Sequence, residues 1–179
     1  ISCSFNVTIL DTINPTVNCI NSQTLYLNST CNYLLPNFMD SISSLDNCDT
    51  SLVITQTPIP GSIINSDTLV TISLTDNSGN NSTCNFTVFL LDTINPVISC
   101  PNNAVVDNDA GQCGAIYSYL TPLGTDNCIS TTTLTSGLPD SSFFPVGVTN
   151  NVYRVIDTAG NFATCSFYVL VNDVELPSI

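Results

Sequence analysis

Residues 69–76 read Leu69-Val70-Thr71-Ile72-Ser73-Leu74-Thr75-Asp76, a regular alternation of apolar and polar side chains. A period of two is typical of a β-strand that buries one of its faces. The strand runs into a turn at 76–80, where Gly79 can adopt a positive φ, and then into a second alternating segment from Cys84 to Leu90. The sequence therefore predicts a β-hairpin, and no window shows a convincing helical stripe.

The hairpin belongs to a repeat of 81 residues. Cys3, Cys84 and Cys165 open three similar segments, with offsets 84 − 3 = 81 and 165 − 84 = 81. We therefore expect an all-β chain of two tandem immunoglobulin-like β-sandwich domains, end to end. The expected parts are residues 1–10 as the last strand of a preceding repeat, 11–91 and 92–173 as the two domains, and 174–179 as the start of a linker to the next repeat.

The charge composition excludes several classes of function. The chain has 14 acidic residues, no histidine and a single cation, Arg154, for a net charge of −13. One cation cannot neutralise phosphates, so nucleic acid is not an expected partner, and the apolar runs are too short for membrane insertion. Acid–base and nucleophilic sites usually need histidine, lysine, thiolates or paired carboxylates. We therefore expect no enzyme activity and no cofactor other than calcium.

Nine cysteines without histidine or a Cys-x-x-Cys pair predict disulfides and an extracellular, oxidising compartment. Four cysteines in each domain allow three connectivities, and the sequence alone does not choose among them. The first and last strands of an immunoglobulin-like sandwich are neighbours, which favours one set over a rival in which Cys84 bonds to Cys100. The favoured pairs are Cys19–Cys84, Cys31–Cys48, Cys100–Cys165 and Cys113–Cys128, with Cys3 bonded to a preceding repeat.

Carboxylates and amides gather in turns that the predicted topology places at the N-terminal end of each domain. Hard cations such as Ca²⁺ prefer these oxygen ligands, so we expect calcium sites at the domain junctions. The alternative is that the same side chains only cap their own turns. The candidate ligands are Asp11, Asp46, Asn47, Asp76 and Asn80 in the first domain, and Asp92, Asp126, Asn127, Asp157 and Asn161 in the second.

The chain also contains glycosylation signals, although chance matches are common in a sequence rich in Asn, Ser and Thr. The Asn-x-Ser/Thr pattern marks Asn6, Asn28, Asn80, Asn81 and Asn85 for N-linked glycans. Asp-Ser/Thr-apolar triplets mark Thr12, Ser41, Thr68, Thr93 and Thr158 for O-linked glycans. Phe89 and Tyr168 have the outward parity of last strands, where they would contact sugars or be covered by a neighbouring strand or chain.

The second repeat resembles a hyalin repeat (HYR) domain. The motifs that carry the resemblance are Asn95-Pro-Val-Ile-Ser-Cys100-Pro101, Gly111-Gln-Cys113, Thr125-Asp126-Asn127-Cys128, Ser142-Phe-Phe-Pro145-Val-Gly147 and Asp157-Thr-Ala-Gly160-Asn161. The first repeat keeps Asp46-Asn47-Cys48 and residues 76–80, but has Ile20 where Cys-Pro is usual. The resemblance implies an immunoglobulin-like fold and an extracellular, adhesion-related context without catalytic residues. The two middle cysteines tend to be lost together in the family, which supports the favoured pairing.

Similar tandem arrays occur in giant surface adhesins of gliding bacteria, which suggests a gliding-motility adhesin. The expected function is a repeated structural stalk segment of an extracellular adhesin or surface filament, stabilised by two disulfides per repeat. The alternatives are a ligand-binding adhesive module for carbohydrate or protein, and a filament subunit that exchanges strands. The expected partners are neighbouring repeats, surface glycans, and host or substratum ligands at the cell surface.

Overall fold

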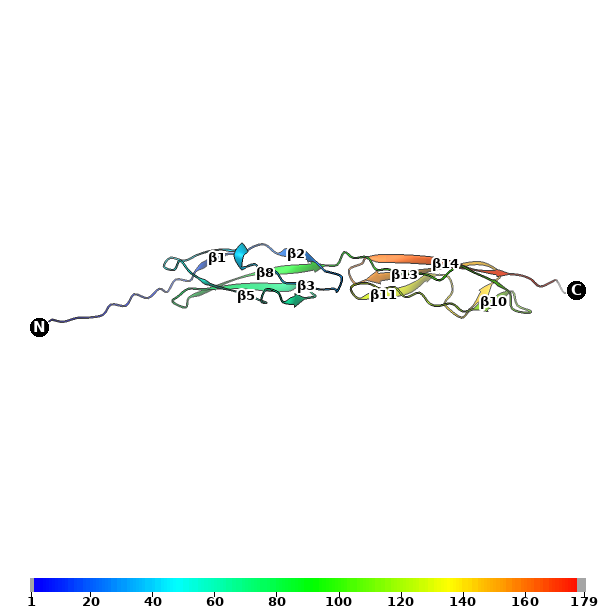
Figure 1. The fold of residues 1–179 in the computed structure, drawn as a ribbon, viewed down its shortest axis with the longest axis horizontal. Coiled ribbons are helices and arrows are strands. Elements are labelled where there is room, and N and C mark those ends of the chain that lie inside the picture. Colours follow the sequence, from blue (N-terminus) through cyan, green and yellow to red (C-terminus); the bar gives the residue numbers. More distant parts are fainter. Residues whose placement is uncertain (1, 177–179) are drawn as a thin grey trace. The chain divides into compact units, whose positions relative to one another are not determined.

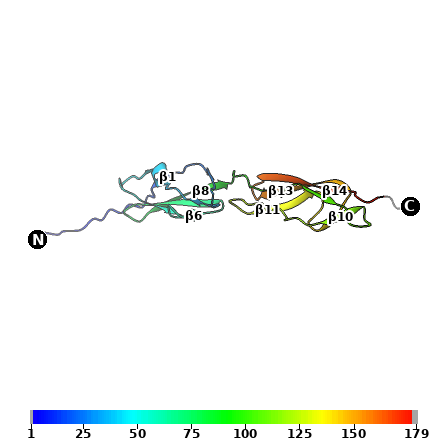
Figure 2. The ribbon, with the colours of Figure 1, turned by 45° about the vertical axis from the view of Figure 1, so that its right-hand side comes forward.

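The computed structural model describes residues 2–176 and divides the chain into two units, with the boundary between Leu91 and Asp92 (Figures 1 and 2). The all-β prediction is confirmed, because the described residues contain β-strands and a single short 3-10 turn, Met39–Ser41. Ile1, expected in a strand, and residues 177–179, expected in a linker, lie outside the described residues. The described residues include no helix that is long and apolar enough to cross a membrane.

Unit 1 has a four-stranded sheet in the order β2-β8-β7-β5 and two short two-stranded sheets, β1-β4 and β3-β6. Its strands are β1 (Thr16–Asn18), β2 (Gln23–Tyr26), β3 (Tyr33–Leu34), β4 (Ser43–Leu45), β5 (Val53–Thr57), β6 (Ile63–Ile64), β7 (Thr68–Thr75) and β8 (Asn81–Leu91). β2 runs parallel to β8, whereas β7 is antiparallel to both of its neighbours, β8 and β5.

Unit 2 has an equivalent four-stranded sheet in the order β11-β13-β14-β9 and one two-stranded sheet, β10-β12, while an isolated bridge between Val97 and Thr125 stands in place of β1-β4. Its strands are β9 (Ala104–Asp107), β10 (Gly114–Tyr117), β11 (Ser130–Ser136), β12 (Ser142–Pro145), β13 (Gly147–Asp157) and β14 (Phe162–Asn172). β9 runs parallel to β14, as β2 does to β8. The two units therefore share one topology, which is that of an immunoglobulin-like sandwich.

The predicted hairpin is present in both units. β7 pairs with β8 in a continuous antiparallel register from Thr68↔Val88 to Thr75↔Asn81. Gly79 has a φ of 90° and Gly160 has a φ of 97°, so both turns use the left-handed region that favours glycine. The alternation decides which face is buried, because Val70, Ile72 and Leu74 are 0% exposed in the core of unit 1.

Unit 2 has a more aromatic core. The ring of Tyr119 lies 4.9 Å from the ring of Phe167 in an edge-on arrangement, and its hydroxyl lies 2.8 Å from that of Tyr153. The Tyr119 hydroxyl also donates to the main-chain oxygen of Leu138 at 2.6 Å. Burial raises the pKa of Tyr119 far above its usual value, with a further contribution from the hydrogen bond to Tyr153. The polar ends of these rings are therefore paired inside the core.

Each unit has a disulfide between the segment that precedes its first long-sheet strand and its last strand. The structure joins Cys19 to Cys84 and Cys100 to Cys165, with Cα–Cα distances of 5.7 and 5.5 Å. Both bonds agree with pairs that are favoured from the sequence. They lie where β2 and β9 begin beside the final strands, so each closes its sandwich along one edge.

The other two predicted pairs are wrong, because Cys48 and Cys113 are free, exposed thiols, as is Cys3. Neither Cys31 nor Cys128 is a free thiol. In unit 1, the turn that holds Cys31 follows β2, beside the C-terminal end of β8, where the amide of Leu27 donates to the oxygen of Leu91 at 3.0 Å.

Cys48 lies at the other end of that strand, because its amide donates to Asp46, whose carboxylate is close to that of Asp76 in the turn before β8. An 11-residue strand spans about 35 Å, and a disulfide needs Cα atoms within about 7 Å. Cys31 and Cys48 therefore cannot bond within unit 1. Cys113 and Cys128 are separated along β14 in the same way.

Residues 2–10 differ from the expected strand. They form no secondary structure, and Phe5, Val7 and Ile9 are 84%, 74% and 92% exposed. Their equivalents 81 residues later, Phe86 and Val88, are buried in the hairpin of unit 1. The alternation of this segment is therefore strand-like, but no described strand of the chain pairs with it.

Candidate cation site

The first component of the site is the aspartate at the start of each domain. The Asp92 Oδ1 atom accepts a hydrogen bond from the amide of Ile94 at 3.0 Å, and the Asp11 Oδ1 atom accepts one from Ile13 at 3.0 Å. This is an Asx turn, so one carboxylate oxygen of each residue holds its own backbone. The other oxygen, Oδ2, is buried and has no hydrogen-bond partner in either residue. Asp92 as a whole is only 7% exposed.

The second component is the Asp-Asn-Cys loop. The Asp46 Oδ2 atom accepts from the amides of Cys48 and Asp49 at 2.8 and 2.9 Å. The Asp126 Oδ2 atom accepts from Cys128 at 3.0 Å. The opposite oxygen, Oδ1, is again buried without a hydrogen-bond partner in both aspartates. Each loop thus repeats the arrangement of the first component, with one oxygen in a turn and one oxygen unused.

The third component is the hairpin turn. Asp157 accepts from the amide and from the side-chain nitrogen of Asn161, both at 2.8 Å, and Asn161 also donates to the main-chain oxygen of Asp92 at 3.1 Å. In unit 1, Asn80 makes the same bonds to Asp76 at 2.7 Å and to Asp11 at 3.1 Å. The asparagine therefore positions the turn against the first aspartate and is not aimed at an ion through its amide nitrogen.

In unit 1 these components bring four carboxylates together. One oxygen from each of Asp11, Asp46, Asp49 and Asp76 lies within 4.8 Å of the other three. Sequence reasoning missed Asp49, although it directly follows the Asp-Asn-Cys motif and was therefore visible as an extra acidic residue. In unit 2 the corresponding group is Asp92, Asp126 and the sulfur of Cys128, which is not a thiolate because Cys128 is disulfide-bonded.

Hydrogen bonding keeps the turn carboxylate of unit 1 ionised. Burial of Asp76 opposes its charge, but the bonds from the side chain and backbone of Asn80 outweigh it and lower the pKa of the carboxyl. The neighbouring thiol responds in the opposite direction, because desolvation and then the charge of Asp11 raise the pKa of Cys48. The cluster is therefore a concentration of negative charge in which one oxygen of each carboxylate lies within 4.8 Å of the others, which suits a hard divalent cation.

Two predicted ligands have other contacts. Asn47 donates to the sulfur of Cys48 at 2.9 Å and is exposed, whereas Asn127 is half-buried and donates to the Asp92 Oδ1 atom at 3.3 Å. The asparagine of the loop therefore supports the first aspartate only in unit 2. The two units also differ at the hairpin turn. Asp76 belongs to the group of acidic residues in unit 1 whose oxygens lie within 4.8 Å of one another, whereas its equivalent Asp157 does not belong to the corresponding group in unit 2.

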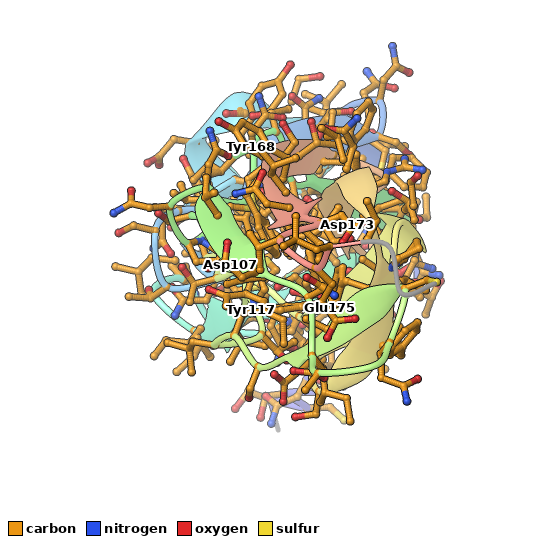
Figure 3. The ribbon with its side chains drawn as sticks, turned by 90° about the vertical axis from the view of Figure 1, so that its right-hand side faces the viewer. Asp107, Tyr117, Tyr168, Asp173 and Glu175 are labelled. Atoms are coloured by element: carbon orange, nitrogen blue, oxygen red, sulfur yellow. A yellow bond between two sulfur atoms is a disulfide. The ribbon has the colours of Figure 1, made fainter. Side chains whose placement is uncertain are left out.

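A third copy of the Asx turn occurs after β14. The Asp173 Oδ1 atom accepts from the amide of Glu175 at 3.1 Å, as Asp11 and Asp92 do from their own second neighbours (Figure 3). The Glu175 carboxylate also accepts from the amide of Gly111 at 2.6 Å. Asp173 belongs to neither of the acidic groups of three or more residues found among the described residues. The turn therefore forms from its local sequence, whether or not a cluster surrounds it.

The outward aromatic residues are partly exposed. Phe89 is 46% exposed on β8 and Tyr168 is half-buried on β14, where its amide donates to the Asn103 side chain at 3.0 Å (Figure 3). A separate hollow of about 540 Å³ in unit 2 is lined by Ser99, Cys100, Pro101 and residues 120–123, without an aromatic ring. Phe89 and Tyr168 are therefore not part of this hollow.

The fold and the site define a class of protein: a tandem array of disulfide-closed, immunoglobulin-like β-sandwich repeats, each with acidic turns at its N-terminal end. The HYR domain model matches residues 10–90 and 91–171. The chain belongs to the HYR domain family.

Similar curated proteins are much longer than this chain. It is 34% identical to hyalin from Strongylocentrotus purpuratus over 182 residues, which cover 97% of the chain and 15% of that protein. It is 32% identical to hyalin from Lytechinus variegatus, over 77% of the chain and 27% of that protein. A Rattus norvegicus protein with sushi, von Willebrand factor type A, EGF and pentraxin domains is 33% identical over 47% of the chain and 2% of its own length.

These matched relatives are animal proteins, so the expected bacterial gliding-motility adhesin is not supported. Among solved structures, human protocadherin-24 EC1-2 is similar over 90% of this chain and 100% of that chain, with a TM-score of 0.37 and 13% identity.

Proposed function

We propose that this chain is a structural segment of an extracellular, adhesion-type protein, and that each repeat binds a calcium ion at its N-terminal end. Membership of the HYR family supports the adhesion-type context. The absence of lysine and histidine from the sequence argues against acid–base catalysis by such groups. In this function the disulfides and the cations stabilise the repeats, and neighbouring repeats are the first partners.

The observation that carries the calcium proposal is the pair of buried carboxylate oxygens left without partners at equivalent positions of both repeats. They belong to Asp11 and Asp46 in unit 1, and to Asp92 and Asp126 in unit 2. A buried polar atom without a partner costs about 1–3 kcal/mol, and more when it is charged. A bound cation would supply the missing partner. The same geometry recurs in both units, which supports a ligand common to the two repeats.

The proposed ion would also fix the linker. Asp92 directly follows Leu91, the last residue of β8, and the Asp92 side chain belongs to unit 2. A cation held by Asp92 and Asp126 would therefore restrain the first residue of unit 2 against a loop of the same unit.

The test is thermal unfolding of the full chain in excess calcium and in excess chelator. A ligand present at about 100 times its dissociation constant adds about 2.7 kcal/mol to the free energy of unfolding. For domains of this size the expected rise in melting temperature is about 10 °C or more. The double variant D92N/D126N should lose the calcium-dependent rise of the transition of unit 2.

The matched control is D107N, which removes one carboxylate from the exposed Asp107 at the opposite end of the unit 2 sheet. It should keep the full response to calcium. Equal melting temperatures of the wild-type chain in calcium and in chelator would show that the carboxylates only cap their turns.

A second candidate function is strand exchange between copies, favoured by the exposure of residues 2–10. This segment has the alternation of a last strand, and its apolar side chains are unpaired in the structure. A chain that lacks residues 1–10 should then sediment as a monomer, whereas the complete chain should associate as its concentration rises. Monomers in both samples would leave the structural-segment function as the better proposal.

Glycosylation stays a proposal for the side chains that are not already used. The Asn80 and Asn81 amide nitrogens donate within the turn and to the neighbouring strand, and Asn28 donates to Asn32 at 2.9 Å. We propose Asn6 and Asn85, both exposed, as the better N-linked acceptors; the Asn85 side chain is engaged through its oxygen, which accepts from the Thr71 hydroxyl at 2.7 Å. For O-linked glycans, Thr12, Ser41, Thr93 and Thr158 are exposed, while Thr68 donates to Ser66 at 2.8 Å. The intact mass of the secreted protein tests both types.

A further inference from the structure

The two acidic clusters differ at one position of the Asp-Asn-Cys loop. Asp49 follows this motif in unit 1, and Ile129 follows it in unit 2. The Asp49 carboxylate accepts from the side-chain nitrogen of Asn77 at 2.6 Å and from the amide of Asn77 at 3.1 Å. These bonds hold Asp49 against the hairpin turn, where one of its oxygens lies within 4.8 Å of the other three carboxylates.

Unit 2 stabilises the equivalent turn without a carboxylate at this position. The amide of Thr158, which is equivalent to Asn77, donates to the main-chain oxygen of Ile129 at 3.2 Å. The Ile129 side chain is 76% exposed. The two repeats therefore connect the loop to the hairpin turn by different means, and only the means used in unit 1 adds a negative charge to the cluster.

We propose that the two cation sites are unequal, and that Asp49 makes the site of unit 1 the tighter one, filled first as the calcium concentration rises. This inference rests on the proposed function, because it assumes that both clusters bind an ion. An acidic cluster alone would not indicate a ligand. The Asp92 Oδ2 atom does, because it is buried without a hydrogen-bond partner in a residue that is only 7% exposed.

The physical reason is the charge of the ligand set. Four carboxylates meet in unit 1, whereas the mutual group in unit 2 contains two. A divalent cation gains from each further carboxylate within about 5 Å, and even with the dielectric constant of water this gain corresponds to about a tenfold change in affinity. Calcium sites elsewhere are tuned in the same way by the number of charged ligands. Repulsion among the four carboxylates also makes the empty site of unit 1 the less stable one.

The experiment is calorimetric titration of the full chain with calcium chloride in chelator-treated buffer. The wild-type chain should bind two ions with dissociation constants that differ about tenfold or more. D92N/D126N should abolish the weak event, and D11N/D46N should abolish the tight one. In the D92N/D126N background, the further variant D49N should weaken the remaining event about tenfold while it keeps an acceptor for Asn77.

The reciprocal variant is I129D in the D11N/D46N background. It adds a carboxylate at an exposed position and should strengthen calcium binding by unit 2, a gain that misfolding cannot produce. The matched control is D67N in the D92N/D126N background, because the Asp67 side chain accepts from the amide of Leu90 at the other end of β8, at 2.8 Å. D67N should leave the affinity unchanged.

The outcomes separate the two proposals. No calcium binding by the wild-type chain overturns the proposed calcium function and this inference together. Two ions bound with equal affinity, with D49N and I129D no different from their parents, overturn the inference alone. Two unequal events with the tight one lost in D92N/D126N also overturn it, because the order of filling is then reversed.

Discussion

The Asn161 side chain donates one hydrogen bond to the main-chain oxygen of Asp92 at 3.1 Å and another to the carboxylate of Asp157 at 2.8 Å. Asn80 bridges Asp11 and Asp76 in the same way, and the two aspartates of each pair are 65 positions apart in sequence (76 − 11 = 65 and 157 − 92 = 65). One amide group thus fastens the start of each domain to the turn of its final hairpin. The site is built on this connection, which the side chain of the asparagine makes with protein oxygens alone.

Substitution of Asn161 should therefore destabilise unit 2. We expect N161A to lower the free energy of unfolding of unit 2 by about 1–3 kcal/mol, because it leaves partly buried oxygens of Asp92 and Asp157 without donors. Urea unfolding in chelator measures this cost without a contribution from calcium. The control N150A, at an exposed position of β13, should change stability by no more than about 0.5 kcal/mol. Equal effects of the two variants would contradict the role of the bridge.

Glycine 137 should not tolerate a side chain. Gly137 has a φ of 96°, and a Cβ atom there would overlap the Oδ1 atom of Asn151, which is fully buried and accepts from the amide of Leu138 at 2.9 Å. Overlap with a buried, hydrogen-bonded group adds to the backbone strain, so G137A should cost about 3 kcal/mol or more.

The matched control is G160A. Gly160 has a nearly identical φ of 97°, but a Cβ atom there would meet nothing within 4 Å. G160A should therefore be destabilised only by the strain of an alanine in the left-handed region, about 1–2 kcal/mol. Denaturant unfolding of both variants compares the two costs, and similar values would show that Asn151 moves aside.

The disulfide of unit 2 should be a large part of its stability. The Cys100–Cys165 bond closes a loop with a sequence separation of 65, and the chain-entropy model gives about 4 kcal/mol for a loop of this size. The double variant C100S/C165S should lose a comparable free energy of unfolding in non-reducing buffer. C113S, which removes an exposed free thiol, should have no effect. A destabilised C113S chain would indicate that Cys113 has a bonded partner in solution.

A pH-dependent contribution is expected from Asp140. Its carboxylate accepts from the amide of Tyr119 at 2.6 Å and from the hydroxyl of Ser118 at 2.8 Å, and the amide bond first, followed by the hydroxyl bond, lowers the pKa of Asp140. A depressed pKa stabilises the fold above the unfolded value of about 3.9, and this stability is lost as the pH falls through the folded value.

The test compares D140N with the wild-type chain by chemical unfolding between pH 7 and pH 2.5. D140N should be the less stable chain at pH 7, and the difference should shrink below about pH 4 as the wild-type carboxylate becomes protonated. D107N reports the effect of removing one exposed carboxylate. A difference between D140N and wild type that stays constant with pH would exclude the ionised form of Asp140 as the stabilising one.

The strands and their buried faces could be predicted because they depend on neighbours in sequence. The alternation from Val70 to Leu74 fixes the core side of β7, and Gly79 permits the turn that reverses the chain. The cysteine pairs were harder to predict. Cys19–Cys84 follows from the adjacency of first and last strands, but the assignment of Cys31 to Cys48 was an elimination, made without knowing that they lie at opposite ends of an 11-residue strand.

The sequence by itself determined the all-β hairpins, the repeat of 81 residues and the Asx turn of each linker aspartate. Even Asp173, with no acidic cluster around it, forms that turn with Glu175. Only the tertiary structure decided that Asp49 joins Asp11 in one cluster and that Cys48 and Cys113 are free. The reason is physical: turns and strand faces arise from contacts a few residues apart, whereas an ion site or a disulfide requires distant segments to meet within a few ångströms.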